Sequence, residues 1–448
     1  MIIGGGYSGA LTAIHLARLD LPGQLSVTVV NPSPDIGRGL AYGYNEDKLL
    51  LNVPAGNMSA LENEPDHFVG YCRRIDPSIS HGSFVSRRIY GQYIQDLYSQ
   101  TQEVRVGVIE TLEGEVVELA RYKGTSGWEL KLLSGRHLKA DQVVMAVGHQ
   151  SPRLPIKLDD NVLANVIDAW DFETMHSLPR DQPVLIVGTG HSAVDALFCL
   201  NQYQPRRPIY LLSRHGLLSH QHRILPTAPK PQAFPAYLRT LPPTIRAYSQ
   251  ALLQQLKAVA EQGGNWCDTL NELRPHSRQI WQSWPESAQR QFLRHIKAYW
   301  EIHRYRLAPM AFQRLDQLLS DCPAHVIAGR ILSIYLQTEG VLVEYRSRGY
   351  QTIERLRVSA VVNCISPSTD IQCNAKPLLA GLMKKGLIKQ DAHGLGLMVT
   401  PSLQILDKQE QPVSGLWYVG PHLKGVGSHR RSRVACKRPI PCTNPCYT

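Results

Sequence analysis

The chain has 448 residues, 43% of them hydrophobic and 19% charged, which predicts two or three folded domains and excludes a disordered polypeptide. Part of its net charge of +11 comes from basic residues near the C-terminus, and the rest suits a protein that handles anionic cofactors, so we expect no nucleic-acid partner. No apolar run is long enough to span a membrane, and the nine scattered cysteines lack metal-binding spacing, so we expect a cytoplasmic protein with no membrane partner and no metal.

The N-terminus predicts a dinucleotide-binding turn. A short apolar strand leads into Gly4-x-Gly6-x-x-Gly9, and a helix follows. The glycines allow a tight turn and close approach of the backbone to a pyrophosphate, which the helix N-terminus then attracts. The next strand, Val27–Val30, ends at Asn31, where such folds usually place an acidic residue for the ribose hydroxyls. Asn31 keeps an acceptor without the charge. A glycine-rich structural turn is the alternative interpretation.

A second turn of the same kind occurs in the middle of the chain. Gly188-x-Gly190-x-x-Ala193 follows an apolar strand, and alanine is a permitted last residue of this motif. The next strand ends at Ser213-Arg214. A hydroxyl and a cation at this point favour a 2′-phosphate, and therefore NADPH, with NADH as the alternative. Arg214 as an ordinary surface residue is the other interpretation.

The two turns open the two copies of a weak internal duplication. Each copy closes with an apolar strand, at 143–148 and at 361–367, and a three-stranded meander precedes each closing strand. Residues 234–320 show helical spacing of apolar side chains and form an insert. The fold class we predict is α/β, with two Rossmann-like dinucleotide-binding domains and a helical insert. An FAD-binding domain (1–175 and 345–425) is interrupted by an NAD(P)-binding domain (176–344).

Two dinucleotide sites in one chain suit an enzyme in which NAD(P)H delivers hydride to a bound flavin. Further motifs occur in the order of a known family: Gly37–Gly43, Leu50–Ser59, Phe84–Gly91, Gly148-His149, Ser213–Gly216, Val362–Cys364 and Leu416–Pro421. Over roughly residues 1–425 the chain resembles the bacterial FAD/NAD(P)-binding proteins grouped with L-aspartate N-monooxygenase and an FAD-dependent urate hydroxylase. These are distantly similar to ornithine and lysine N-hydroxylases and other class B flavin monooxygenases.

The resemblance implies cofactor contacts. The ADP half of FAD would be held by Gly4, Gly6, Gly9 and Asn31, while Arg38 and the segment Leu51–Ser59, with Asn52 and Met58, would lie near the flavin. Gly148 and Gly420 would lie at strand ends where the two cofactor sites meet. By its residues alone, the 52–56 loop is also compatible with an ordinary β-turn.

The catalytic residues are unknown, and the candidates are Arg87, Arg88 and Asn52. The two arginines can clamp a phosphate or a substrate carboxylate, or they can belong to a solvated helix face. His303, Arg304 and Arg306 lie on the helical insert, where a structural role is favoured over catalysis.

The resemblance also implies a reaction. NADPH reduces FAD, the reduced flavin forms a C4a-(hydro)peroxide with O2, and oxygen passes to a nitrogen of a small amine or related compound. The protein then orients the reactants and excludes water. A flavin-dependent NAD(P)H reductase or dehydrogenase, and an inactive dinucleotide-binding protein, remain as alternatives.

The two ends of the chain depart from the family pattern. Ile2-Ile3 forms only the stump of a strand, so we expect the true start upstream. Residues 426–448 are basic, rich in cysteine and proline, and aperiodic. We expect an aberrant, disordered tail that arises from a frameshift near residue 425, with a naturally divergent tail as the alternative.

Overall fold

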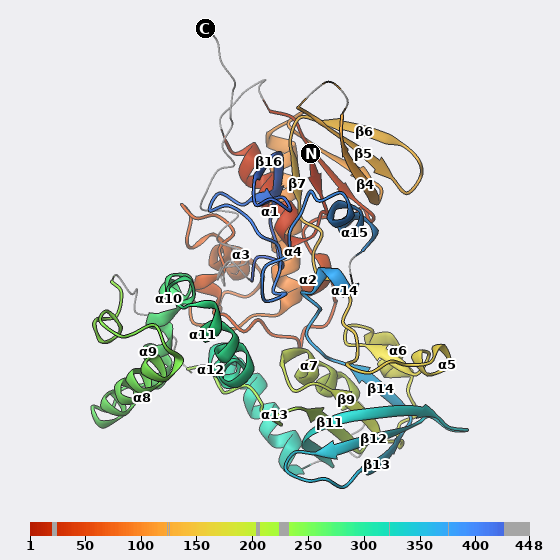
Figure 1. Cartoon of the computed structure of the whole chain (residues 1–448), viewed down its shortest axis with the longest axis vertical. Coiled ribbons are helices and arrows are strands. Elements are labelled where there is room, and N and C mark those ends of the chain that lie inside the picture. The colour runs from red at the N-terminus through yellow and green to blue at the C-terminus, as the bar shows by residue number, and fades with distance from the viewer. Residues whose placement is uncertain are drawn as a thin grey trace. The chain divides into compact units, whose positions relative to one another are not determined.

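The computed structural model describes residues 1–19, 25–122, 124, 126–202, 207–223, 233–321, 323–374 and 376–424. The chain divides into two compact units (Figure 1). The first contains residues 1–150, 274–284 and the described residues from 368 onwards. The second contains residues 151–273 and 285–367.

A six-stranded sheet forms the centre of the first unit. Its strands, in the order β15-β16-β7-β1-β2-β3, are β15 (Gln404–Leu406), β16 (Pro412–Tyr418), β7 (Val143–Met145), β1 (Ile2–Ile3), β2 (Val27–Asn31) and β3 (Ile109–Glu113). All neighbours pair in parallel except β15 and β16. The central strands are almost wholly buried, as expected for parallel strands covered on both faces.

Helices and a small second sheet cover this sheet. The antiparallel sheet consists of β4 (Val116–Arg121), β5 (Trp128–Leu132) and β6 (His137–Ala140), and confirms the first predicted meander. The helices are α1 (Tyr7–Ala17), α2 (Gly39–Tyr42), η1 (Ala55–Asn57), α3 (His67–Ile75), α4 (Arg87–Val104), η3 (Arg274–His276), α10 (Ser277–Ser283), α14 (Ile371–Asn374) and α15 (Pro377–Lys384). α1 packs against α4, and the Ser86 hydroxyl caps the start of α4.

A seven-stranded sheet forms the centre of the second unit. Its strands, in the order β13-β12-β11-β10-β9-β14-β8, are β13 (Glu354–Val358), β12 (Val341–Ser347), β11 (Ala324–Leu336), β10 (Ile209–Ser213), β9 (Val184–Val187), β14 (Ala360–Asn363) and β8 (Val166–Asp168). Its strands from β8 to β10 are parallel. β11 pairs in parallel with β10 and then antiparallel with β12, which confirms the second predicted meander (Figure 1).

The predicted insert at 234–320 is helical. The helices of the second unit are α5 (Asp160–Leu163), α6 (Phe172–Ser177), α7 (His191–Leu200), η2 (Ala236–Leu238), α8 (Ile245–Glu261), α9 (Trp266–Leu273), α11 (Glu286–Gln291), the π-helical turn η4 (Phe292–Ile296), α12 (Lys297–Arg304) and α13 (Pro309–Asp321). Pro285 stands at the N-cap of α11, where a missing N–H has no cost.

The predicted α/β class is confirmed. The predicted domain bounds at 175 and 345 stay a prediction, while the compact units change over near residues 150 and 367. The predicted tail, 426–448, lies outside the described residues. Within the described ranges, no helix is long and apolar enough to cross a membrane, and no cluster of histidine, cysteine or acidic side chains is suited to a metal ion.

Candidate functional site

The two predicted glycine-rich turns have the same geometry. Each first glycine has positive φ, +99° at Gly4 and +124° at Gly188. A Cβ on Gly4 would lie 2.5 Å from the carbonyl oxygen of Ala146, and one on Gly188 would lie 2.6 Å from that of Cys364. Each turn therefore passes over the end of the neighbouring parallel strand, β7 or β14, at a distance that only glycine allows.

Each turn leads into a helix with an open N-terminus. Gly6 is the N-cap of α1 and Gly190 that of α7, and no described side chain caps either helix. Neither first turn contains an acidic residue. The amides of the first helical turn and the helix dipole therefore favour an anion at both places. Position 9 requires glycine, because an added Cβ would lie 1.8 Å from the Gly4 carbonyl oxygen. The equivalent position of the second turn accommodates the side chain of Ala193, which is fully buried.

The side chain of Asn31 braces the first turn from the end of β2. Its Oδ1 accepts a hydrogen bond of 2.8 Å from the Gly5 amide, and its Nδ2 donates to the Ser33 carbonyl at 2.7 Å. The prediction that Asn31 contacts a ribose remains untested. An amide suits the observed bracing, because a carboxylate lacks the N–H group that reaches Ser33.

A second glycine-rich segment, residues 37–39, closes over the same turn. The Gly37 amide donates to the Gly5 carbonyl at 2.8 Å, and a Cβ on Gly39 would lie 3.1 Å from the Cα of Gly6. Arg38 therefore lies beside the turn, where its Nη2 donates to Asn45 Oδ1 at 2.9 Å. The structure thus brings the predicted residues Gly6 and Arg38 together from separate motifs.

The predicted flavin-proximal segment, residues 51–59, is held along residues 81–87. Amides of Ala55 and Gly56 donate to the carbonyls of Ser83 and His81 at 2.8 and 2.9 Å. The segment contains η1, so it is an ordered structure with more backbone support than an isolated β-turn. Asn52 and Met58 are both half-buried in it.

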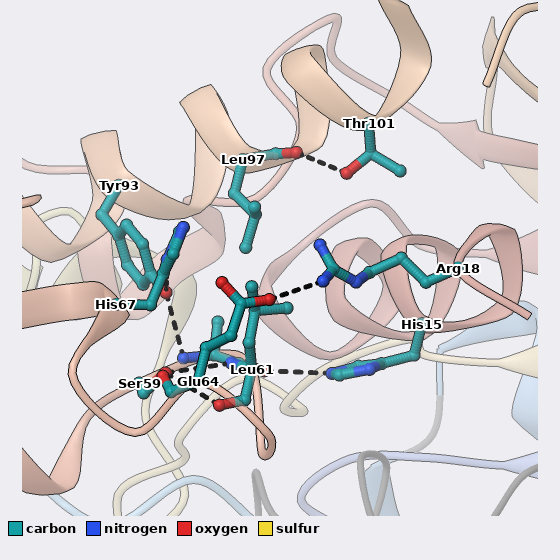
Figure 2. A network of polar contacts seen from close by, with 10 residues as sticks. His15, Arg18, Ser59, Leu61, Glu64, His67, Tyr93, Leu97 and Thr101 are labelled. Carbon is teal, nitrogen blue, oxygen red and sulfur yellow. Dashed lines mark hydrogen bonds and ion pairs between the residues drawn. The ribbon is translucent and has the colours of Figure 1, made fainter. Parts of the chain in front are cut away.

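A polar network fixes the end of this segment (Figure 2). The Ser59 hydroxyl lies 2.6 Å from the Glu64 carbonyl, and the Ala60 amide donates to the Tyr93 hydroxyl of α4 at 3.2 Å. On the other side, the Nε2 of His15 on α1 hydrogen-bonds the Ala60 carbonyl at 3.0 Å. The backbone of Ala60 is therefore hydrogen-bonded to side chains of both α1 and α4.

Burial shifts the protonation equilibria of two histidines of this network towards the neutral form. Burial lowers the pKa of His15, although its bond to the Ala60 carbonyl acts in the opposite direction. Burial also lowers the pKa of His67, whose Nδ1 lies 2.8 Å from the Tyr93 hydroxyl (Figure 2). The same cause raises the pKa of Tyr93 to about 12, so the phenol stays protonated.

Gly148 and Gly420 follow the parallel neighbours β7 and β16, so both lie at the sheet edge that the first glycine turn faces. That the two cofactor sites meet at Gly148 and Gly420 stays a prediction.

Next to these glycines in the sequence are two buried residues that the sequence analysis missed, Gln150 and His422. Gln150 Nε2 lies 3.4 Å from His422 Nε2, and the two residues are 1% and 0% exposed. Gln150 Oε1 also accepts a hydrogen bond from the Lys376 amide at 2.9 Å.

The catalytic candidates Arg87 and Arg88 occupy different environments in the first turn of α4. Arg88 forms a 2.6 Å ion pair with Asp47, and both side chains are substantially exposed. Arg87 Nε donates to the Leu50 carbonyl at 3.3 Å, which places it against the segment that precedes Asn52. Arg87 is therefore the better placed of the two to act near that segment.

In the second unit, cations gather at the end of β10. The Ser213 hydroxyl accepts hydrogen bonds of 3.0 Å from the Thr189 hydroxyl and from the Gly216 amide, so it links the glycine turn to the loop after β10. Arg214 is exposed. Arg348, which the sequence analysis missed, reaches the same loop and donates to His215 Nδ1 at 2.8 Å. Burial and the two arginines lower the pKa of His215.

Comparisons with known proteins agree with this geometry. Residues 1–150 match the family profile described as FAD-NAD(P)-binding. None of the curated protein sequences compared with the chain matches it.

The chain is similar to three solved structures of monooxygenases. An L-lysine 6-monooxygenase from Pseudomonas syringae is 17% identical, over 97% of this chain and 96% of that one, with a TM-score of 0.66. An ornithine N-hydroxylase from Kutzneria sp. 744, with reduced FAD, NADP+ and L-ornithine, is 14% identical over 97% and 95%, with a TM-score of 0.62. A cadaverine monooxygenase from Erwinia amylovora, bound to FAD, is 12% identical over 99% and 96%, with a TM-score of 0.60.

At these identities the likeness shows a shared fold, so the fold predicted from the sequence, with two dinucleotide-binding domains, is confirmed. Residues 1–150 match the FAD-NAD(P)-binding family, and the chain has the fold of the monooxygenases to which it is similar.

Proposed function

We propose that the chain is an FAD-dependent, NAD(P)H-oxidising monooxygenase that hydroxylates a nitrogen of a small amine, with O2 as co-substrate. The observation that carries this proposal is the presence of two equivalent glycine turns, each before an uncapped helix. One such site suits a dehydrogenase, whereas two suit hydride transfer from a nicotinamide to a flavin. The similar structures act on lysine, ornithine and cadaverine, and so support an amine as the substrate class.

The first unit fits FAD. A pyrophosphate group requires a backbone free of side chains, and Gly4, Gly6 and Gly9 provide one where added Cβ atoms would meet other backbone atoms or the ligand space. Asn31 and Arg38 flank this turn and supply an acceptor and a cation. The residues that we assign near the flavin ring are Asn52, Met58, Gly148 and Gly420.

The second unit fits NADPH. Gly188, Gly190 and Ala193 form the pyrophosphate turn, and β10 ends at Ser213 and is followed by Arg214, with no acidic residue at this point. Arg348 adds a second cation to the loop after β10. Two cations at this loop, whose residues 214–223 include no acidic side chain, favour a 2′-phosphate over a free ribose hydroxyl, so NADPH is the expected donor and NADH the poorer one.

The residues of the chain bind and orient the reactants. When bound, FAD supplies the acceptor for hydride and the means of activating O2. The amides at the start of α1 and α7 would hold the two pyrophosphates, and the network around Ser59 keeps residues 51–59 in one conformation. The role that we assign to Arg87 is to bind an anionic group near Asn52, which its hydrogen bond to the Leu50 carbonyl supports. A cytoplasmic location is supported by four buried cysteines that are free thiols.

Purification of the full chain followed by absorption spectroscopy tests the proposal. We expect a flavin band that bleaches on addition of NADPH without O2 and returns under air. With lysine, ornithine or cadaverine present under air, NADPH oxidation should produce a hydroxylated amine. NADPH oxidation that yields only peroxide, or that needs an added electron acceptor, would indicate a reductase. A protein that stays colourless after reconstitution with FAD would contradict the flavoenzyme assignment altogether.

A further inference from the structure

The guanidinium of Arg306 is buried in the second unit with its charge uncompensated. Arg306 follows α12 and is 2% exposed. Its Nη2 donates to Asn271 Oδ1 at 2.7 Å. Its Nε and Nη1 are also buried, and neither has a hydrogen-bond partner among the described residues. A buried cation without a counter-charge is strongly unfavourable, which points to a partner that is itself an anion.

The residues around Arg306 do not supply that charge. Asp268 lies on α9, but Arg223 Nη1 binds both of its oxygens, at 2.7 and 2.5 Å. The Cys267 thiol is hydrogen-bonded to the Arg306 side chain, but burial raises the pKa of the thiol, although the charge of Arg306 and this hydrogen bond act in the opposite direction. A thiol with a raised pKa is no counter-charge for the guanidinium. The segments of sequence outside the described residues contain one acidic side chain, Asp20, which belongs to the N-terminal part of the chain.

Aromatic rings connect this buried charge with the surface. The Trp266 ring lies 5.5 Å from the Arg306 guanidinium carbon, and the His303 ring lies 5.3 Å from Trp266. The ring centroids of His303 and His220 lie 4.3 Å apart with the planes tilted by 43°, and His220 is exposed. The ring contacts thus run from the buried Arg306 guanidinium through half-buried Trp266 and His303 to the exposed His220.

The cluster also adjoins the second glycine turn. The Arg306 carbonyl lies 3.3 Å from Nε2 of His191, which is the first residue of α7. The Leu307 amide donates to the His220 carbonyl at 2.9 Å, so the backbone that follows α12 is hydrogen-bonded to the loop that follows β10. The backbone at Arg306 is therefore in contact with the first residue of α7, the helix assigned to the nicotinamide nucleotide.

We propose that Arg306, with Asn271 and Trp266, forms a binding site for an oxyanion, either a phosphate or a carboxylate group. Guanidinium N–H groups make strong charge-assisted hydrogen bonds to both kinds of group, and a low-dielectric setting strengthens them. A phosphate of the nicotinamide nucleotide and the carboxylate of an amino-acid substrate are the two sources. The choice between these sources rests on the proposed function, but the existence of the site does not.

Thermal unfolding of the full chain, with and without inorganic phosphate at constant ionic strength, tests the site. We expect phosphate at about a hundred times its dissociation constant to raise the Tm of the wild type by roughly 5 °C. Arg306→Met should melt at or above the wild-type Tm without phosphate, because it removes an unpaired buried charge. It should show no response to phosphate.

Arg207→Met is the matched control. Arg207 is 3% exposed, and its Nη2 donates to the carbonyls of Leu178 and Pro179 at 3.0 and 2.9 Å. Its replacement leaves these carbonyls unsatisfied, so Arg207→Met should melt below the wild type and keep the phosphate response. The proposal is overturned if Arg306→Met likewise melts lower, or if phosphate raises the Tm of wild type and Arg306→Met equally.

Titrations with NADP+, NAD+ and acetate then identify the source. Weaker binding of NADP+ alone to Arg306→Met assigns the site to the 2′-phosphate, and weaker binding of both nucleotides assigns it to the pyrophosphate. Unchanged nucleotide binding, together with an acetate response that needs Arg306, assigns it to a substrate carboxylate. The melting experiment requires no flavin, so a colourless protein with an intact phosphate response would refute the proposed function and leave the oxyanion site standing.

Discussion

Replacing Gly190 with alanine separates nucleotide binding from folding. Gly190 has an ordinary backbone conformation, with φ of −82°, and no atom lies within 4 Å of the position that a Cβ would take. A glycine-to-alanine change in a compatible conformation stabilises a protein by about 0.4–1 kcal/mol through the unfolded state. Alanine is a poorer N-cap by a similar amount, so the two effects offset one another. We therefore expect a Tm within about 3 °C of the wild type.

Nucleotide binding should respond very differently. The added methyl group occupies the space through which the turn approaches the pyrophosphate. Displacing the phosphates from the start of α7 removes about two charge-assisted hydrogen bonds, each worth about 1.5 kcal/mol. The loss of about 3 kcal/mol corresponds to roughly a hundredfold weaker binding of NADPH.

Calorimetric titration with NADPH, paired with thermal unfolding, measures both effects. Gly188→Ala is the comparison, because its Cβ would lie 2.6 Å from the Cys364 carbonyl oxygen at a φ of +124°, and it should lose stability as well as affinity. A Gly190→Ala protein that folds normally and binds NADPH within threefold of the wild type would refute the assignment of this turn to the pyrophosphate.

Three further changes test other parts of the structure. Gly6→Ala, whose Cβ would meet only the Gly39 Cα at 3.5 Å, should keep the fold but lower the FAD content of the purified protein, and full flavin occupancy would contradict this. Arg348→Gln should raise the KM for NADPH by about tenfold and leave that for NADH within twofold, because a charge-assisted bond to the 2′-phosphate is worth about 1.5 kcal/mol. Equal effects on both cofactors would argue against that role. The pKa values of His15 and His67 are lowered in the folded chain, so below the ordinary histidine pKa of 6.5 the unfolded chain binds more protons than the folded one. The free energy of unfolding should therefore fall as the pH drops through and below 6.5. His15→Gln should reduce this pH dependence in urea unfolding, and an unchanged slope would show that His15 is not responsible.

The sequence predicts well those features that depend on local pattern. Gly4 and Gly188 stand out because a strand, a positive-φ position and a helix N-terminus follow one another within a few residues. The two meanders and the helical insert are visible in the same way, as alternation or helical spacing of apolar side chains. Such features require no knowledge of what lies beside them.

Contacts between distant segments could not be predicted. Arg348 is brought to the loop after β10 by the pairing of β11 with both β10 and β12, and nothing near Arg348 in the sequence signals this. The role of Asn31 depends on Gly5, which β1 and β2 place next to it. The burial of Arg306 is hidden for the same reason, since arginine on a helical insert is usually a surface residue.

The Gln150 amide determines the tautomer of His422. Its oxygen is already engaged by the Lys376 amide, so the group that faces His422 Nε2 is the NH2, which can only donate. His422 Nε2 must then accept, and its proton resides on Nδ1. Turning the Gln150 amide over would abandon its hydrogen bond from the Lys376 backbone amide. The main chain at residue 376 therefore sets the orientation of a buried imidazole that it does not itself contact, through a single intervening amide.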